Sequence, residues 1–250
     1  MELAFFAPFG LIIGSFLNVV AYRLPRGESL VHPRSRCTSC GNEVRAIDNV
    51  PLLSWLFLRG RCRHCSEQIS ARYPAVELAT AVVFAIVVLA RGVSLELLLY
   101  LPFAAMLITV ADIDLEHRIV PNRILAPMAV WAVAASAVVQ PDKLPELLIA
   151  GAAAVTFLLL TALAYPAGMG MGDVKLAGVM GLYLGAAVAP GMLIAFLTGS
   201  VVGVAIMLRH GAGARKQGVP FAPFMALGGL VALVAGTELI DLYSRTFLGA

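Results

Sequence analysis

The sequence predicts an all-α polytopic membrane protein in which one small polar domain follows the first helix. Two observations carry this prediction. Hydrophobic residues make up 60% of the 250 residues and charged residues only 13%, with a mean hydropathy of +0.89, which lies outside the range of soluble domains of this length. The apolar residues also gather in runs long enough to cross a bilayer, and one long polar segment interrupts them.

About eight apolar runs have the length of a membrane-spanning helix, roughly 17 to 22 residues. The first run lacks the basic start and the small-residue cleavage site of a secretory signal, so we expect it to be retained as a helix. The expected helices are residues 3–22, 75–90, 95–111, 120–139, 147–165, 174–189, 191–208 and 221–240. The corresponding domains are a first transmembrane helix (1–22), a polar domain (23–74) and a transmembrane helical domain (75–250).

The basic residues are distributed unevenly between the loops. If successive loops alternate across the bilayer, 15 of the 18 Lys and Arg residues fall on the side of segment 23–74, and only Arg91, Lys143 and Arg245 fall on the other. Beyond that segment, the basic side holds Arg118, Arg123, Lys175, Arg209, Arg215 and Lys216. The positive-inside rule therefore predicts an outward N-terminus and a cytoplasmic polar domain. The basic residues form no groove or stacking platform, so no nucleic-acid partner is expected.

All four cysteines lie in the polar segment, as the pairs Cys37/Cys40 and Cys62/Cys65. Two CxxC pairs can place four thiolates around one tetrahedral ion. Thiols on the cytoplasmic side stay reduced, which favours Zn²⁺ over disulfides. Four sulfur ligands leave no open position for a catalytic water, so we expect a structural zinc that stabilises a loop with little apolar core.

A glycine-rich polar break, Gly168–Lys175, interrupts the apolar background further along the chain. Its acid, Asp173, stands out because ionisable residues at membrane depth usually face a cavity, a partner or a pathway. Gly170 and Gly172 would let a substrate backbone approach the carboxylate. The simpler alternative is that Asp173 caps a helix. Lys175 either orients a carboxylate or meets lipid headgroups.

A second acid is available in the stretch around residues 112–114. A pair of carboxyl groups can hydrolyse a peptide when one is protonated and the other is ionised. Two acids that are brought close reach this state by mutual repulsion. Asp112 and Asp114 are two residues apart and project to nearly opposite helix faces, so only one of them can face Asp173. Helix geometry alone leaves both as candidates.

The order and spacing of these motifs resemble the type IV prepilin (leader) peptidases, membrane aspartyl proteases of the GxGD class. Asp114 stands seven residues before Pro121, which is the family's spacing from its first catalytic aspartate to an Ile/Val-Pro-Asn/Asp turn. The resemblance thus selects Asp114 over Asp112 and implies Asp173 as the second catalytic acid. The other matching stretches are Gly14–Pro25, the paired CxxC loop, Arg72–Glu77, Gly170–Asp173 and Pro220–Phe224. Ala222 departs from the pattern, because glycine is usual there.

This resemblance implies an endopeptidase of the bacterial inner membrane. Its expected reaction is cleavage of the leader from type IV prepilins or type II secretion pseudopilins at the cytoplasmic face, with residues 75–250 as the catalytic domain. Many relatives also methylate the new N-terminus with S-adenosylmethionine. The resemblance extends that expectation to the cysteine loop and its flanks without assigning a residue.

Two other functions compete with the peptidase hypothesis. Asp114 and Asp173 could line the path of a proton- or cation-coupled transporter, because intramembrane acids often do so. Such a transporter would usually carry internal repeats, and the cysteine loop has no counterpart in the second half of the chain. The other possibility is a structural scaffold with a zinc-bound docking loop, in which the acids are helix caps.

Overall fold

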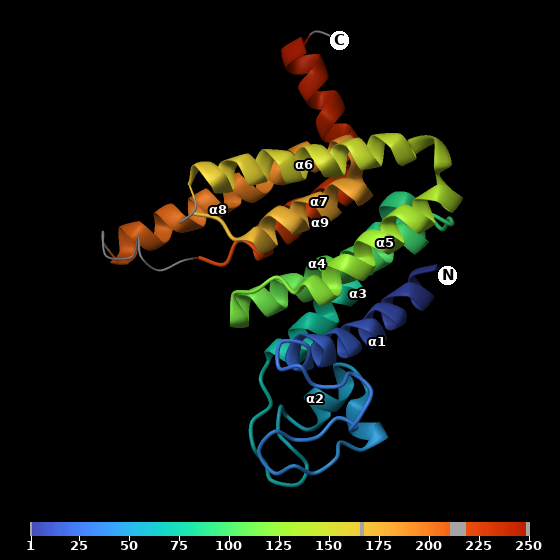
Figure 1. The fold of residues 1–250 in the computed structure, drawn as a ribbon. Coiled ribbons are helices and arrows are strands. Elements are labelled where there is room, and N and C mark those ends of the chain that lie inside the picture. Colours follow the sequence, from blue (N-terminus) through green and yellow to red (C-terminus); the bar gives the residue numbers. More distant parts are fainter. Residues whose placement is uncertain (1, 166–167, 211–218, 249–250) are drawn as a thin grey trace. The chain divides into compact units, whose positions relative to one another are not determined.

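The computed structural model describes residues 2–165, 168–210 and 219–248, and these are mostly helical (Figure 1). The predicted all-α polytopic fold is confirmed for this part of the chain. Its long helices are α1 (Glu2–Arg23), α3 (Arg72–Arg91), α4 (Leu97–His117), α5 (Asn122–Val139), α6 (Leu144–Ala164), α7 (Met171–Leu184), α8 (Val188–His210) and α9 (Ala222–Tyr243). Arg215 and Lys216, which enter the charge argument, lie outside the described residues.

Seven stretches of the described residues are long and apolar enough to cross a membrane. The expected number was about eight, and the difference lies in one stretch of 39 residues, Met171–Arg209, which contains α7 and all of α8 but its last residue. The described residues also form short helical turns: η1 (Ala46–Asn49), α2 (Leu53–Phe57), η2 (Pro141–Lys143), η3 (Gly185–Ala187) and the π-turn η5 (Ser244–Leu248).

The break between α7 and α8 comes earlier than the sequence predicted, at residues 185–187 instead of near residue 190. Gly185 ends α7 with a φ of +57°, a backbone conformation that favours glycine. The next backbone N–H, that of Ala186, donates to Glu146 Oε1 over 3.1 Å. A glycine turn and a carboxylate acceptor on α6 therefore set this boundary, and apolar run length could not reveal it.

The chain divides into two compact units, residues 1–93 and 94–250. In the first unit α1 packs along α3, and two glycines of α1 allow the close approach. A Cβ atom on Gly14 would lie 2.7 Å from the Cα of Glu77, and one on Gly10 would lie 2.6 Å from the Cα of Ala81. This division into compact units does not test the predicted domain boundaries at residues 22 and 74, which stay a prediction.

Between α1 and α3 the chain forms a loop that holds η1 and α2 (Figure 1). Its start is fixed by Arg23, the buried last residue of α1. The Arg23 guanidinium donates to the backbone oxygens of Ser29 and Pro33 over 2.9 and 2.7 Å. A buried charge needs such partners, so this arginine has a structural role in shaping the loop.

In the second unit α4 is the most deeply buried helix and packs against α5, α7 and α9. Its inward residues include Phe103, Leu107 and Ile113, which are fully buried. Phe103 stacks on Tyr183 of α7 with ring centroids 4.6 Å apart. Leu107 lies against Gly229 of α9. These contacts fix the axial position of α4 relative to the first turns of α7 and α9, which carry the site.

Close helix contacts at glycine hold α6 against α7, as small residues commonly do between membrane helices. A Cβ atom on Gly181 would lie 2.6 Å from the Cα of Gly151. We therefore expect Gly181→Ala to destabilise the protein by about 1–3 kcal/mol through overpacking. The readout is a lower Tm in detergent.

Gly203→Ala in α8 is the matched control, because a Cβ atom there meets nothing within 4 Å. Alanine is the better helix former by up to about 1 kcal/mol, so the Tm should hold or rise. Equal melting temperatures for the two variants would show that the α6–α7 contact tolerates a methyl group.

Candidate functional site

The four cysteines of the first unit come together in one cluster. Their Sγ atoms all lie within 4.8 Å of one another, and the Sγ atoms of Cys37 and Cys65 are 3.8 Å apart. Four thiolates at about 2.3 Å from a tetrahedral zinc ion would themselves be separated by about 3.8 Å. The cysteines are free thiols, so the donor set fits a metal ion better than a disulfide.

Each CxxC pair sits in a tight turn of the same design. The Gly41 N–H donates to the Cys37 oxygen, and the Ser66 N–H donates to the Cys62 oxygen, both over 2.9 Å. Both turns close with a left-handed residue, Gly41 at φ +72° and Ser66 at φ +60°. The two pairs were predicted from the sequence and the shared turn was not, although the repeated Arg-Cys-x-x-Cys pattern was a usable signal for it.

The four neighbouring thiols favour the binding of a cation. Backbone N–H groups of Cys40 and Ser39 point at the Cys37 sulfur and lower the pKa of Cys37 to about 6. The Glu67 N–H also lowers the pKa of Cys65, but burial and the neighbouring thiols raise it to about 12. Four thiolates this close cannot all ionise by themselves. A bound metal would remove the repulsion.

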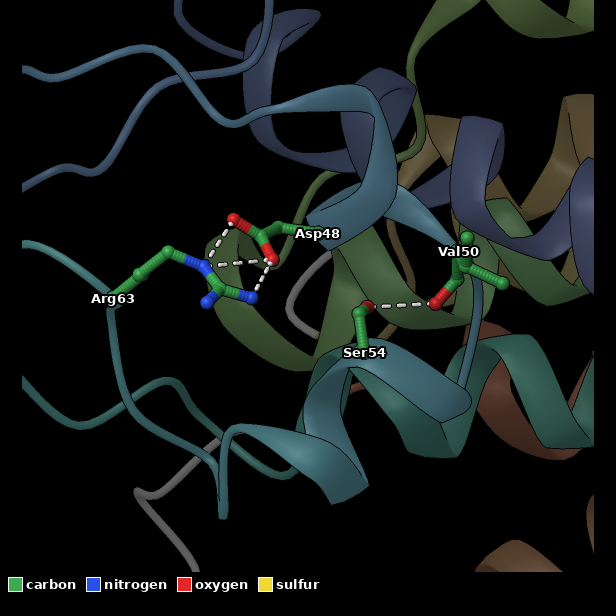
Figure 2. A network of polar contacts seen from close by, with 4 residues as sticks. All are labelled: Asp48, Val50, Ser54 and Arg63. Carbon is green, nitrogen blue, oxygen red and sulfur yellow. Dashed lines mark hydrogen bonds and ion pairs between the residues drawn. The ribbon is translucent and has the colours of Figure 1, made fainter.

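An ion pair braces the second turn of the cluster (Figure 2). The Arg63 guanidinium donates to both carboxylate oxygens of Asp48 in η1, over 2.6 to 3.0 Å. These hydrogen bonds hold the pKa of Asp48 below its usual value. Since Arg63 lies between Cys62 and Cys65, the pair joins η1 to the metal-ligand turn, and a forked arginine–carboxylate contact gives it a defined geometry.

The acid site of the second unit begins with Asp114, near the C-terminal end of α4. The residue is buried, with 5% of its surface exposed. Its Oδ2 accepts a hydrogen bond from the backbone N–H of Ala222 over 3.1 Å. Ala222 opens α9, and the first N–H groups of a helix have no partner within the helix. The end of α9 therefore orients this carboxylate.

Asp173 is the third residue of α7. The backbone of Gly170, the residue that precedes α7, hydrogen-bonds its carboxylate, as in a helix capping box. Gly170 lies against the same group, because a Cβ atom there would be 3.5 Å from Asp173 Oδ2. Gly172 instead meets Val120, with a would-be Cβ distance of 2.8 Å. Its missing side chain thus allows packing against the α4–α5 connection.

The structure places Asp114 near the end of α4 and Asp173 in the first turn of α7, and these two helices pack against each other. Asp112 is also buried, but the helical repeat turns it by about 200° from Asp114. The capping contact and the second acid, which the sequence presented as alternatives, are both present at Asp173. A capped carboxylate can still take part in a pair of acids.

Lys175 lies on the exposed side of α7 and donates to Asn122 Oδ1 over 3.1 Å. Asn122 opens α5, so the lysine joins the N-terminal ends of α5 and α7. The sequence offered a carboxylate or lipid headgroups as its partner. The observed partner is the asparagine of the Val-Pro-Asn turn, which places Lys175 in support of the local backbone.

Two contacts of this site were not predicted from the sequence, those of Ala222 with Asp114 and of Val120 with Gly172. The Pro-Phe-Ala-Pro stretch around Ala222 was noticed only as a family motif. Pro223 stands in the first turn of α9, a position typical of a helix start, and the N–H of Ala222 has no partner within the helix. That signal is local, whereas its acceptor lies 108 residues away.

Comparison with known proteins covers both units. Residues 9–91 match the bacterial peptidase A24 N-terminal domain, and residues 101–208 match the type IV leader peptidase family. A relative from Bacillus subtilis (strain 168), named prepilin leader peptidase/N-methyltransferase, is 37% identical over 96% of this chain and 97% of its own length. The chain belongs to the type IV leader peptidase family.

Two further relatives of this leader peptidase carry the same name. The one from Pseudomonas putida is 33% identical over 92% of this chain and 89% of its own length. The one from Myxococcus xanthus (strain DK1622) is 38% identical over 86% and 66%, respectively. No solved structure matches the chain. Family membership decides in favour of a membrane peptidase over a transporter or a scaffold.

The two matched regions divide the candidate sites between them. The N-terminal match contains the four cysteines, and the leader peptidase match contains Asp114 and Asp173. The second match ends at residue 208, so Ala222 lies beyond it. The contact that orients Asp114 in this leader peptidase is therefore visible only in the structure.

The left-handed residue in each cysteine turn yields a prediction. A non-glycine residue in this conformation costs roughly 1–2 kcal/mol. Replacement by glycine removes this cost, but the larger backbone entropy that glycine loses on folding offsets part of the gain in stability. We expect Ser66→Gly to strengthen metal retention by up to about 1 kcal/mol and Gly41→Ser to weaken it. The measurement is the chelator concentration that removes half of the bound metal. Unchanged retention in both variants would argue against strain at these turns.

Proposed function

We propose that this leader peptidase cleaves the leader from type IV prepilins, or from secretion pseudopilins, with Asp114 and Asp173 as its two catalytic acids. Three relatives named prepilin leader peptidase/N-methyltransferase support the substrate class. The observation that supports the assignment of the acids is their place in the fold, with Asp114 near the end of α4, oriented by the first N–H of α9, and Asp173 in the first turn of α7, which packs against both helices.

The proposed reaction uses one protonated and one ionised carboxyl group. Repulsion between two close carboxylates in a buried site keeps one proton on the pair. The ionised group takes a proton from a water molecule, whose oxygen attacks the scissile carbonyl carbon. The protonated group donates a hydrogen bond to the carbonyl oxygen. When the tetrahedral intermediate collapses, the C–N bond breaks and the carboxyl group that took the proton from water gives it to the leaving amine, which leaves one proton on the pair as at the start.

The surrounding residues have positioning roles in this proposal. The Ala222 N–H holds Asp114 at one oxygen and leaves the other available. Gly170 keeps the space beside Asp173 open to a peptide backbone. Gly172 and Lys175 fix the start of α7 against Val120 and Asn122. Small displacements of reacting groups cost much of an enzyme's rate, so these contacts bear on catalysis without touching the substrate.

We infer that the protein resides in the inner membrane, with its N-terminus outside and both candidate sites on the cytoplasmic side. The excess of Lys and Arg on that side supports this orientation. A substrate whose cleavage site adjoins its own membrane helix also suits acids that lie at helix ends. Asp114 lies three residues before the end of α4, and Asp173 lies at the start of α7.

We further propose that the cysteine cluster binds one structural Zn²⁺ and that the protein also methylates the amine exposed by cleavage. The four-sulfur geometry supports the metal. The names of the relatives support the methylation. S-adenosylmethionine would supply the methyl group, and the new N-terminal nitrogen would lose a proton on accepting it.

Substitution of the acids tests the peptidase assignment. We expect Asp114→Asn and Asp173→Asn each to lower kcat by at least about 100-fold, because an amide can neither take up nor supply the proton. The assay is cleavage of a prepilin by purified protein in detergent. Asp112→Asn is the control and should keep most of the activity. Near-full activity in either of the first two variants would overturn the pair, and loss only in the Asp112 variant would move it there.

Metal analysis tests the zinc assignment. We expect about one zinc ion per chain and its loss in Cys62→Ser, since three thiolates hold the ion more weakly than four. His64→Ala lies in the same turn and should keep the metal, because no histidine belongs to the four-sulfur group in the described residues. A disulfide within either pair, without zinc, in protein from a reducing cytosol would contradict the proposal.

A further inference from the structure

The short helix α2 presents an apolar face to the outside of the first unit. Leu53, Leu56 and Phe57 are 52%, 62% and 84% exposed. Their spacing of three and four residues places them on one side of the helix. Three large apolar side chains gathered on one face indicate an interaction surface, whereas single exposed ones are common.

The orientation of this face is fixed from the opposite side of α2. Trp55 donates from Nε1 to the Ile69 oxygen over 3.1 Å. Its ring covers Gly60, where a Cβ atom would lie 2.9 Å from the indole. With the tryptophan held inward by these contacts, Leu53, Leu56 and Phe57 cannot turn inward without breaking them. Their exposure is therefore a built feature of the loop.

A hydrogen bond fixes the depth of α2 beside the membrane-spanning helix α3. The Leu52 N–H donates to Glu77 Oε2 over 2.8 Å. α3 has 20 residues with an arginine at each end, a length of about 30 Å that matches the hydrocarbon core. Glu77 is the sixth residue of α3, about 7.5 Å from its start. The start of α2 is thus held within about 7.5 Å of the headgroup–acyl boundary, on its hydrocarbon side.

The charges near α2 suit an anionic lipid surface. Residues 49–66 contain no acidic residue. Arg59 and Arg61 follow α2 directly, and both are exposed. Interfacial helices combine an apolar face buried about 5–10 Å into the leaflet with basic residues at the headgroups. The depth, the apolar face and the arginines agree with this arrangement.

We propose that the α2 face, formed by Leu53, Leu56 and Phe57, inserts into the bilayer leaflet at the N-terminal end of α3, with Arg59 and Arg61 at anionic headgroups. Because α2 lies between the two CxxC pairs, this insertion anchors the metal-binding loop to the membrane surface. The proposal rests on the membrane-spanning α3 and is independent of the peptidase reaction.

Quenching by brominated lipids tests this insertion in the full-length protein. The chain has two tryptophans, Trp55 and Trp131, and Trp131→Phe provides the background. Phe57→Trp in that background reports on the α2 face. Val31→Trp is the control, because Val31 is 74% exposed in the same loop but lies outside α2. The proteins are reconstituted in vesicles of phosphatidylcholine and phosphatidylglycerol, with or without bromine on the acyl chains.

We expect brominated lipid to remove much of the added emission in Phe57→Trp, and to leave that of Val31→Trp largely unchanged. The emission maximum of the Phe57→Trp indole should also lie to the blue of the control. Quenching at position 57 no stronger than at position 31 would overturn the proposal. A blue-shifted but unquenched indole would do so as well, because it would place protein over the face. Equal metal content in both variants verifies that the loop is folded.

Discussion

The hydrogen bond from the Ala222 N–H to Asp114 is the contact on which the acid site depends. A buried carboxylate such as that of Asp114 is costly unless a hydrogen-bond donor meets it. Here the donor is the first N–H of α9, which has no acceptor within its own helix, and the bond is 3.1 Å long. It joins residues 108 positions apart and requires α4 and α9 to stay in register. The buried side chains of α4 enforce that register.

Close packing also fixes the position of Asp173. Gly172 lies against Val120, and Lys175 donates to Asn122, so the start of α7 is fixed to the connection that follows α4. The two acids thus approach from helix ends that are tied to each other by several short contacts. The absence of a side chain at Gly172 permits this close approach. Among the described glycines of the motif, only Gly170 lies directly against the Asp173 carboxylate.

Much of this organisation could be predicted from the sequence, because it follows from local patterns. Apolar run length predicted the order of the long helices, and the CxxC spacing predicted a four-cysteine cluster. Contacts between distant segments could not be predicted this way. The α7–α8 break depends on Glu146, and the orientation of Asp114 depends on Ala222. Helix periodicity also left Asp112 and Asp114 open, and only the family spacing distinguished them.

The claim that Asp114 and Asp173 act as one unit is tested most directly by a double-mutant cycle on kcat/KM for prepilin cleavage. If the two acids share one proton and one water molecule, removal of either one abolishes the function of both. Removal of the second acid should therefore lower kcat/KM little further. We expect Asp114→Asn/Asp173→Asn to retain about the same residual activity as either single variant. Losses that multiply in the double variant would show that the two acids act independently, and would contradict the proposed pair.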